Sequence, residues 1–62
     1  YEEALKDFNK AIELNSQYGY AYLNRGNVLE MQRKQKDACA DWEKAAELGV
    51  SSAKTYINQV CN

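Results

Sequence analysis

The sequence predicts an all-α protein in which antiparallel helix pairs stack as an α-solenoid. Three observations support this fold class: a segment that occurs twice, apolar residues at helical intervals in both copies, and the absence of proline. Residues 4–14 return as residues 38–48, and six positions are identical at an offset of 34: Ala4 and Ala38, Asp7 and Asp41, Lys10 and Lys44, Ala11 and Ala45, Glu13 and Glu47, Leu14 and Leu48. A fixed period of this length indicates a repeat protein.

The first predicted helix runs from Tyr1 to Leu14. Its apolar stripe is Ala4, Leu5, Phe8, Ala11 and Ile12, which is the spacing of an amphipathic helix. Glu2 and Glu3 suit the positive N-terminal end of a helix, and Asn15 and Ser16 follow its end.

The second predicted helix runs from Gln17 or Tyr18 to Gln32, and Arg33 to Lys36 form the next turn. Gly26 lies in its interior, where glycine costs about 1 kcal/mol relative to alanine. A glycine there needs a packing reason. We expect it to allow close approach to Ala38 on the third helix, with Tyr22 and Trp42 around the contact.

The third predicted helix runs from Asp37 to Leu48, with Gly49 as a left-handed stop. Ser51 or Ser52 is expected to cap a fourth helix, whose apolar stripe lies on the third helix: Ala53, Tyr56, Ile57, Val60 and Cys61. Val60 occupies the position that corresponds to Gly26 one period earlier. Since no further helix could pack closely there, this last segment is interpreted as a cap.

These positions resemble the tetratricopeptide repeat family, which has an aromatic residue, a glycine four residues later, and then Ala, Phe and Ala in the second helix of each repeat. The matching residues here are Tyr22, Gly26, Ala38, Trp42 and Ala45, preceded by Ala4, Phe8 and Ala11. The chain departs from the family at Arg25 (usually Leu), Leu29 (usually Tyr), and Ser16 and Val50 (usually Pro). The resemblance extends from Tyr1 to about Val60.

The resemblance divides the chain into three parts. Residues 1–16 form the second helix of one repeat, residues 17–50 a complete repeat, and residues 51–62 a C-terminal capping helix. A chain of 62 residues that begins without methionine is expected to be a fragment of a longer protein. The first helix would then expose part of Leu5, Phe8 and Ile12.

Composition and motifs argue against several functions. The net charge of −1 argues against general nucleic-acid binding, and the basic cluster Arg33, Lys34 and Lys36 is interpreted as a solvated loop. No run of 18 apolar residues could span a membrane. The sequence has no histidine and no glycine-rich phosphate loop. The acidic residues are expected on helix exteriors, paired with nearby lysines, so we predict no enzyme, cofactor or metal site.

The two cysteines allow two interpretations. Cys39 precedes Gly49 by ten residues and Cys61 follows it by twelve, so an antiparallel hairpin would place them at nearly the same level. They could form a disulfide, which would imply an exported or periplasmic protein. They could also be two separate thiols in a cytoplasmic protein.

The predicted binding residues lie on the face of the second helix that neither of its apolar core stripes uses, and the same line continues one period later in the fourth helix. They are Tyr20, Leu23, Asn24, Asn27, Glu30, Met31, Lys54, Ile57 and Asn58. In the family this line forms a concave groove for extended or helical peptides. The resemblance therefore implies a non-enzymatic scaffold with a protein or peptide partner.

Three alternatives remain open at the level of sequence. The face could be a hydrated helix surface with incidental apolar residues. The chain could be a self-association module that forms homo-oligomers through its first helix or by helix exchange. A redox role could rest on Cys39 and Cys61.

Overall fold

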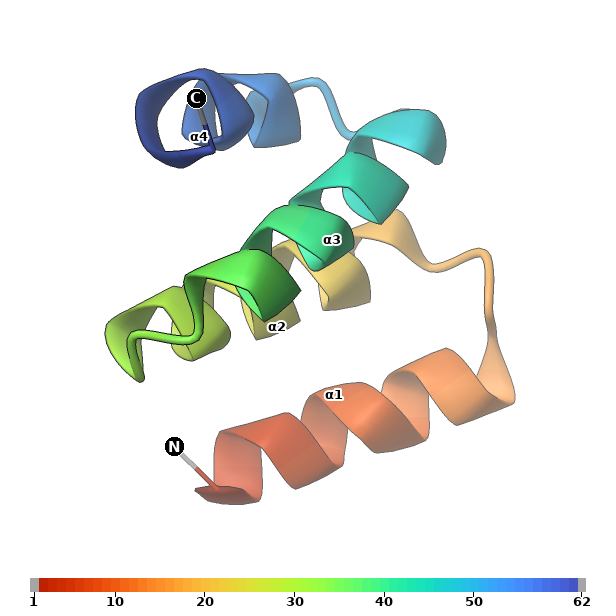
Figure 1. The fold of residues 1–62 in the computed structure, drawn as a ribbon. Helices are drawn as coiled ribbons and strands as arrows, with labels where there is room; N and C mark the ends of the chain where they lie inside the picture. The colour runs from red at the N-terminus through yellow and green to blue at the C-terminus, as the bar shows by residue number, and fades with distance from the viewer. Residues whose placement is uncertain (1, 62) are drawn as a thin grey trace.

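The described part of the chain, residues 2–61 of a computed structural model, consists of four α-helices and no strand. The helices are α1 (Glu2–Leu14), α2 (Gly19–Met31), α3 (Gln35–Glu47) and α4 (Ser52–Val60). Each helix packs against the next, so the chain is a stack with α1 at one end and α4 at the other (Figure 1). The all-α prediction is confirmed. The predicted start at Tyr1 and end at Asn62 lie outside the described residues.

The turn between α2 and α3 is shorter than predicted, because α3 begins at Gln35 and not at Asp37. Arg33 adopts a left-handed conformation with φ of 63°. The amide of Lys34 donates to the Leu29 carbonyl and the amide of Arg33 to the Glu30 carbonyl, both at 2.9 Å. A left-handed residue that ends a helix in this way is usually glycine. Here it is arginine, so the sequence carries no glycine to show where α2 ends.

The turn between α3 and α4 contains Gly49 with φ of 97°, as predicted. The expected serine cap is wrong, because Ser51 stands at the cap position but makes no side-chain hydrogen bond. The first amides of α4 use backbone acceptors instead. Ala53 donates to the Val50 carbonyl and Lys54 to the Ser51 carbonyl, each at 3.1 Å.

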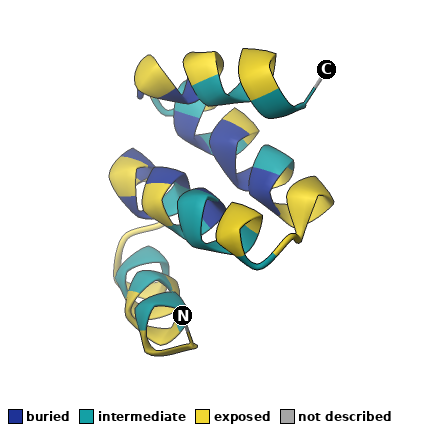
Figure 2. Ribbon diagram, turned by 90° about the vertical axis from the view of Figure 1, so that its left-hand side faces the viewer, coloured by how far each residue is buried: buried dark blue, intermediate teal, exposed yellow. Residues whose placement is uncertain are grey.

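The core lies on α3, between α2 and α4, where Ala38, Trp42 and Ala45 are buried (Figure 2). A Cβ atom at Gly26 would lie 2.6 Å from Nε1 of Trp42 and 3.2 Å from the Ala38 carbonyl oxygen. The predicted close approach is therefore confirmed, and the indole is the nearest neighbour. On its other side Trp42 stacks on Tyr56 of α4, with ring centroids 5.4 Å apart.

Helix α1 contacts α2 without burying any of its own residues. Leu5, Phe8 and Ile12 are half-buried, as expected for a helix with one neighbour. Leu14, at the end of α1, is 75% exposed. One side of this helix is thus covered by α2, and the apolar stripe is incompletely sheltered.

Replacing Gly26 with leucine tests the contact between α2 and α3. We expect Gly26→Leu to lower the free energy of unfolding by about 1–3 kcal/mol, because the new side chain must displace the Trp42 indole. Urea unfolding followed by circular dichroism measures the loss. Asn24→Leu places the same side chain on an exposed position of the same helix and should shift stability by less than about 0.5 kcal/mol. Equal losses in the two variants would contradict the packing explanation.

Candidate functional site

Most of the predicted binding residues are at the surface of α2 and α4. Tyr20 is 58% exposed and Met31 57% exposed, and the other exposed members are Asn24, Glu30, Lys54 and Asn58. Asn27 is half-buried. We call the predicted residues other than Leu23 the α2–α4 face: Tyr20, Asn24, Asn27, Glu30 and Met31 on α2, and Lys54, half-buried Ile57 and Asn58 on α4.

Leu23 does not belong to this surface. It is 8% exposed and belongs to the core cluster together with Val50 and Ala53. The prediction that Leu23 lies on the exposed face is wrong, because the side chain is buried in a cluster formed with residues of α3, of the following turn and of α4. The period within α2 alone could not show which flank of the stripe the following repeat covers.

A cavity of about 350 Å³ opens at the C-terminal end of the α2–α4 face. It brings together three predicted residues, Asn27, Glu30 and Met31, and four that the sequence did not suggest: Trp42, Tyr56, Gln59 and Val60. The Trp42 Nε1 group donates to Oδ1 of Asn27 at 3.2 Å. The cavity therefore has aromatic and aliphatic walls with polar groups among them, a composition common in binding sites. Tyr20, Asn24, Lys54 and Asn58 do not line it.

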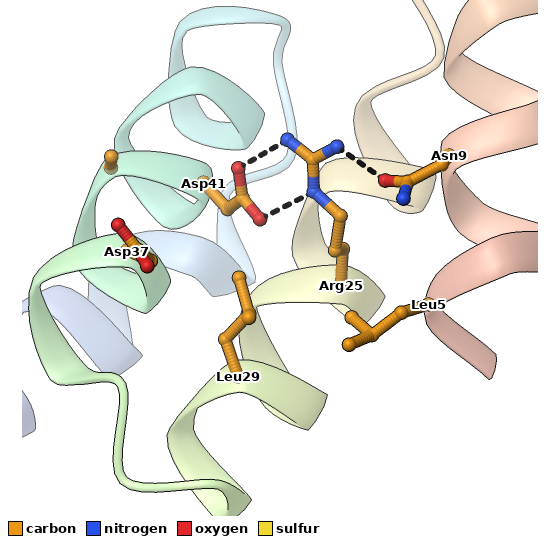
Figure 3. A pocket seen from close by; sticks show the side chains of 7 residues that line it. Leu5, Asn9, Arg25, Leu29, Asp37 and Asp41 are labelled. Atoms are coloured by element: carbon orange, nitrogen blue, oxygen red, sulfur yellow. Dashed lines mark hydrogen bonds and ion pairs between the residues drawn. The ribbon is translucent and has the colours of Figure 1, made fainter. Parts of the chain in front are cut away.

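A second polar arrangement, which the sequence did not suggest, is centred on Arg25 (Figure 3). Its Nε and Nη2 groups donate to the two carboxylate oxygens of Asp41, each at 2.7 Å. Its Nη1 group donates to Oδ1 of Asn9 at 2.8 Å, and the guanidinium carbon lies 5.5 Å from the Tyr22 ring centroid. One side chain of α2 thereby joins α1 to α3.

The ion pair corrects the expectation that every acidic residue lies on a helix exterior. Asp41 is 7% exposed, and its two-point pairing with Arg25 satisfies both carboxylate oxygens. The hydrogen bonds from Arg25 to Asp41, reinforced by the charge of Asp41, raise the pKa of Arg25 despite the opposing effect of burial. Arg25 therefore stays charged throughout the ordinary pH range. By contrast, Lys44 and Glu47 form a local exposed pair at 3.6 Å.

The cavity beside Arg25, of about 320 Å³, is lined by residues of three helices. Its apolar walls are Leu5, Leu29 and Ala40, and Asp37 contributes a further carboxylate. The guanidinium within it is already bound to Asp41 and Asn9 (Figure 3). This arrangement holds the helices together and leaves the charge of Arg25 compensated.

The two cysteines lie at the opposite end of the α3 and α4 pair from Gly49. The sulfur atoms of Cys39 and Cys61 are 2.05 Å apart, a disulfide distance, and their Cα atoms are 5.9 Å apart. The bond joins α3 to the residue that follows α4. Of the two interpretations that the sequence left open, the structure has the bridged one.

Neither a metal site nor a membrane-spanning helix is present in the described residues. Residues 2–61 contain no group of three or more side chains arranged to hold a metal ion. Among the same residues, no helix has the length and apolar character needed to cross a membrane.

The fold and the repeated helix pair define a helical repeat protein. A family model described as a TPR repeat matches residues 1–32, about half of the chain, and the chain belongs to the tetratricopeptide repeat family. It is 40% identical over 58 residues to tetratricopeptide repeat protein 36 of Xenopus tropicalis, covering 87% of this chain. It is 37% identical over 59 residues to protein STIP1 homolog of Dictyostelium discoideum, covering 95% of this chain.

The chain spans 29% of the length of the first relative and 10% of the second. No solved structure matches the chain. Tetratricopeptide repeats are in general protein-interaction scaffolds without catalytic activity of their own. Membership of the family supports that general role for the chain.

Replacing Arg25 tests the ion pair with Asp41. Arg25→Leu should lower the free energy of unfolding by about 2–3 kcal/mol, less than for a fully buried pair because the arginine is partly exposed. The loss arises because Asp41 keeps a buried charge without a partner.

The double variant Arg25→Leu with Asp41→Leu removes both charges, so we expect it to recover most of that loss. Chemical unfolding of the wild type, of the single variants Arg25→Leu and Asp41→Leu, and of the double variant, compared as a thermodynamic cycle, measures the coupling. A double variant no more stable than Arg25→Leu alone would contradict the assignment.

Proposed function

We propose that the chain binds a peptide or protein segment on the α2–α4 face and works by binding alone. The observation that supports this best is the combination of exposed contact residues with an adjoining cavity. Tyr20 and Met31 are large and exposed, and such side chains supply contact area at interfaces. The cavity at the end of the face provides a place for one side chain of the partner.

The chemistry of the face favours a segment with an exposed backbone and an apolar side chain. Asn24 and Asn58 occupy equivalent positions one period apart, and an amide can both donate and accept hydrogen bonds to a peptide backbone. The aromatic rings of Trp42 and Tyr56 line the cavity. An apolar partner side chain entering it would replace water at these rings.

The charges of the face are mixed and not of one sign. Glu30 on α2 and Lys54 on α4 are both exposed. A partner that places a basic group near Glu30 and an acidic group near Lys54 would match both charges. Charge would then determine the orientation of the bound segment and contribute less to its affinity.

A binding role without catalysis is consistent with the ionisable groups. The sequence contains no histidine. Asp41, the buried carboxylate, is paired with Arg25 through both oxygens. A carboxylate whose two oxygens are both bonded to an arginine is not poised to act as a general base in proton transfer.

The double variant Tyr20→Ala with Asn24→Ala tests the face. A peptide is first selected from a displayed random library for binding to the wild-type chain. This peptide should bind the variant at least about tenfold more weakly, which is a loss of about 1.4 kcal/mol in binding free energy. Fluorescence anisotropy with the labelled peptide measures the affinity, and circular dichroism should show unchanged helicity. Lys10→Ala with Glu13→Ala, two exposed positions on α1, is the matched control. Unaltered affinity in the Tyr20 and Asn24 variant would defeat the site assignment.

Self-association is a second candidate, favoured by the repeat pattern at the two ends of the stack. α1 corresponds to α3 at an offset of 34, and Tyr22, Leu23 and Asn24 of α2 correspond to Tyr56, Ile57 and Asn58 of α4. Because α2 packs on α3, α4 of one copy corresponds to the partner of α1 of another, but with Val60 in place of Gly26 these two helices would pack less closely than α2 and α3. The half-buried Leu5, Phe8 and Ile12 would provide the contact.

Light scattering over a range of concentrations tests this second candidate. Head-to-tail association predicts a mass that rises with concentration, and Phe8→Ala should lower the mass while helicity is retained. A monomer at all concentrations would exclude the association and favour peptide binding.

A further inference from the structure

Helix α4 is short and is attached to α3 at its C-terminal end. It has nine residues, and isolated helices shorter than about 12–15 residues are marginally stable in water. Two bonds fix its end to the beginning of α3. One is the disulfide between Cys39 and Cys61, and the other is a hydrogen bond of 2.6 Å from Nε2 of Gln35 to the Val60 carbonyl.

The same helix carries part of the proposed binding surface. Lys54 and Asn58 belong to the α2–α4 face, and Tyr56, Gln59 and Val60 line its cavity. Tyr56 also stacks on Trp42 and covers one side of the indole. A displacement of α4 would therefore change the cavity and the core at once.

The disulfide borders a surface cavity. Cys39 and Cys61 are half-buried, and both line a cavity of about 690 Å³. Arg33 and Lys36 line the same cavity with one carboxylate, that of Glu43. Thiol and disulfide exchange proceeds through a thiolate, and the excess of positive charge favours thiolates that carry a further negative group.

We infer that the Cys39–Cys61 disulfide is a thiol-exchange site that regulates the α2–α4 face, with small carboxylate-bearing thiols as its reductants. The inference about regulation rests on the proposed binding function. Reduction removes the covalent bond between α3 and the residue that follows α4, while the hydrogen bond of Gln35 to Val60 stays in place. The residues of α4 that line the cavity are then no longer held in a fixed position by a covalent bond.

The exchange needs two thiols for each disulfide. The first thiolate attacks one cysteine sulfur, the bond between Cys39 and Cys61 breaks, and its electron pair leaves on the other sulfur, which takes a proton. A second thiolate attacks the reductant sulfur of the resulting mixed disulfide and releases the second cysteine as a thiolate, which also takes a proton. The protein gains two electrons and two protons, and the two reductant molecules become one disulfide.

Reduction kinetics test the choice of reductant. Rate constants per thiolate are measured for 3-mercaptopropionate and for neutral 2-mercaptoethanol at low salt. We expect the ratio of the two constants to fall at least threefold in the variant Arg33→Asn with Lys36→Gln, and to fall likewise in wild type at high salt. Lys10→Gln on α1 is the matched control and should keep the wild-type ratio. A ratio that the Arg33 and Lys36 changes leave unaltered would overturn the assignment of the reductant class.

Hydrogen exchange tests the structural consequence without any partner. In the reduced chain, amides of α4 should exchange at least tenfold faster than in the oxidised chain, while those of α2 and α3 change less. Trp42, the one tryptophan of the sequence, should become more accessible to a fluorescence quencher. The variant Cys39→Ala with Cys61→Ala should reproduce the reduced form. Equal protection of α4 in both forms, or loss of all helices together, would overturn the local switch.

The peptide selected on the wild-type chain tests whether the redox state of the disulfide also controls binding. Reduction should weaken its binding at least tenfold, and reoxidation should restore it. If the oxidised chain binds no peptide, the proposed binding function fails, while hydrogen exchange still decides whether α4 is released. If the peptide binds equally well in both redox states, the regulation fails and the binding function stands.

Discussion

The contact between Gly26 and the indole of Trp42 is the constraint on which the rest of the structure depends. It sets the separation of α2 and α3, since any side chain at position 26 would enter the space of the ring. With the ring fixed there, its other side is available to Tyr56 of α4. The ring also reaches Asn27 and lines the cavity of the binding face. Core packing and the candidate site therefore share one side chain.

Much of the fold could be predicted because the determining interactions leave a periodic trace. The small residues Ala38 and Ala45 recur at the 34-residue offset as Ala4 and Ala11, and Gly26 marks the close contact of α2 with α3. Gly49 likewise marks a turn for which glycine is the usual residue. Arg33 adopts a similar left-handed conformation without any such signal, since an arginine is compatible with helix, turn or loop.

The candidate site was less predictable, because its geometry depends on how neighbouring repeats meet. The pattern within α2 did not distinguish Leu23 from its exposed neighbours, and its burial arises in a cluster with residues of α3, the following turn and α4. Arg25 and Asp41 are 16 residues apart, so no local spacing connects them. The unusual arginine at a position where the family prefers leucine was the available clue. Asp41 could not be distinguished from a solvated acid, because its burial arises from three packed helices.

The bridge from Arg25 to Asn9 also bears on how such units could be linked in tandem. Asn9 lies on the repeat before Arg25, and the residue 34 positions after Asn9 is Glu43. In an array made of identical copies of residues 17–50, each internal guanidinium would meet a second carboxylate in place of an amide. Concatenation would thus turn an isolated ion pair into a charged ladder along the seam between units, whose contribution should decline as ionic strength rises.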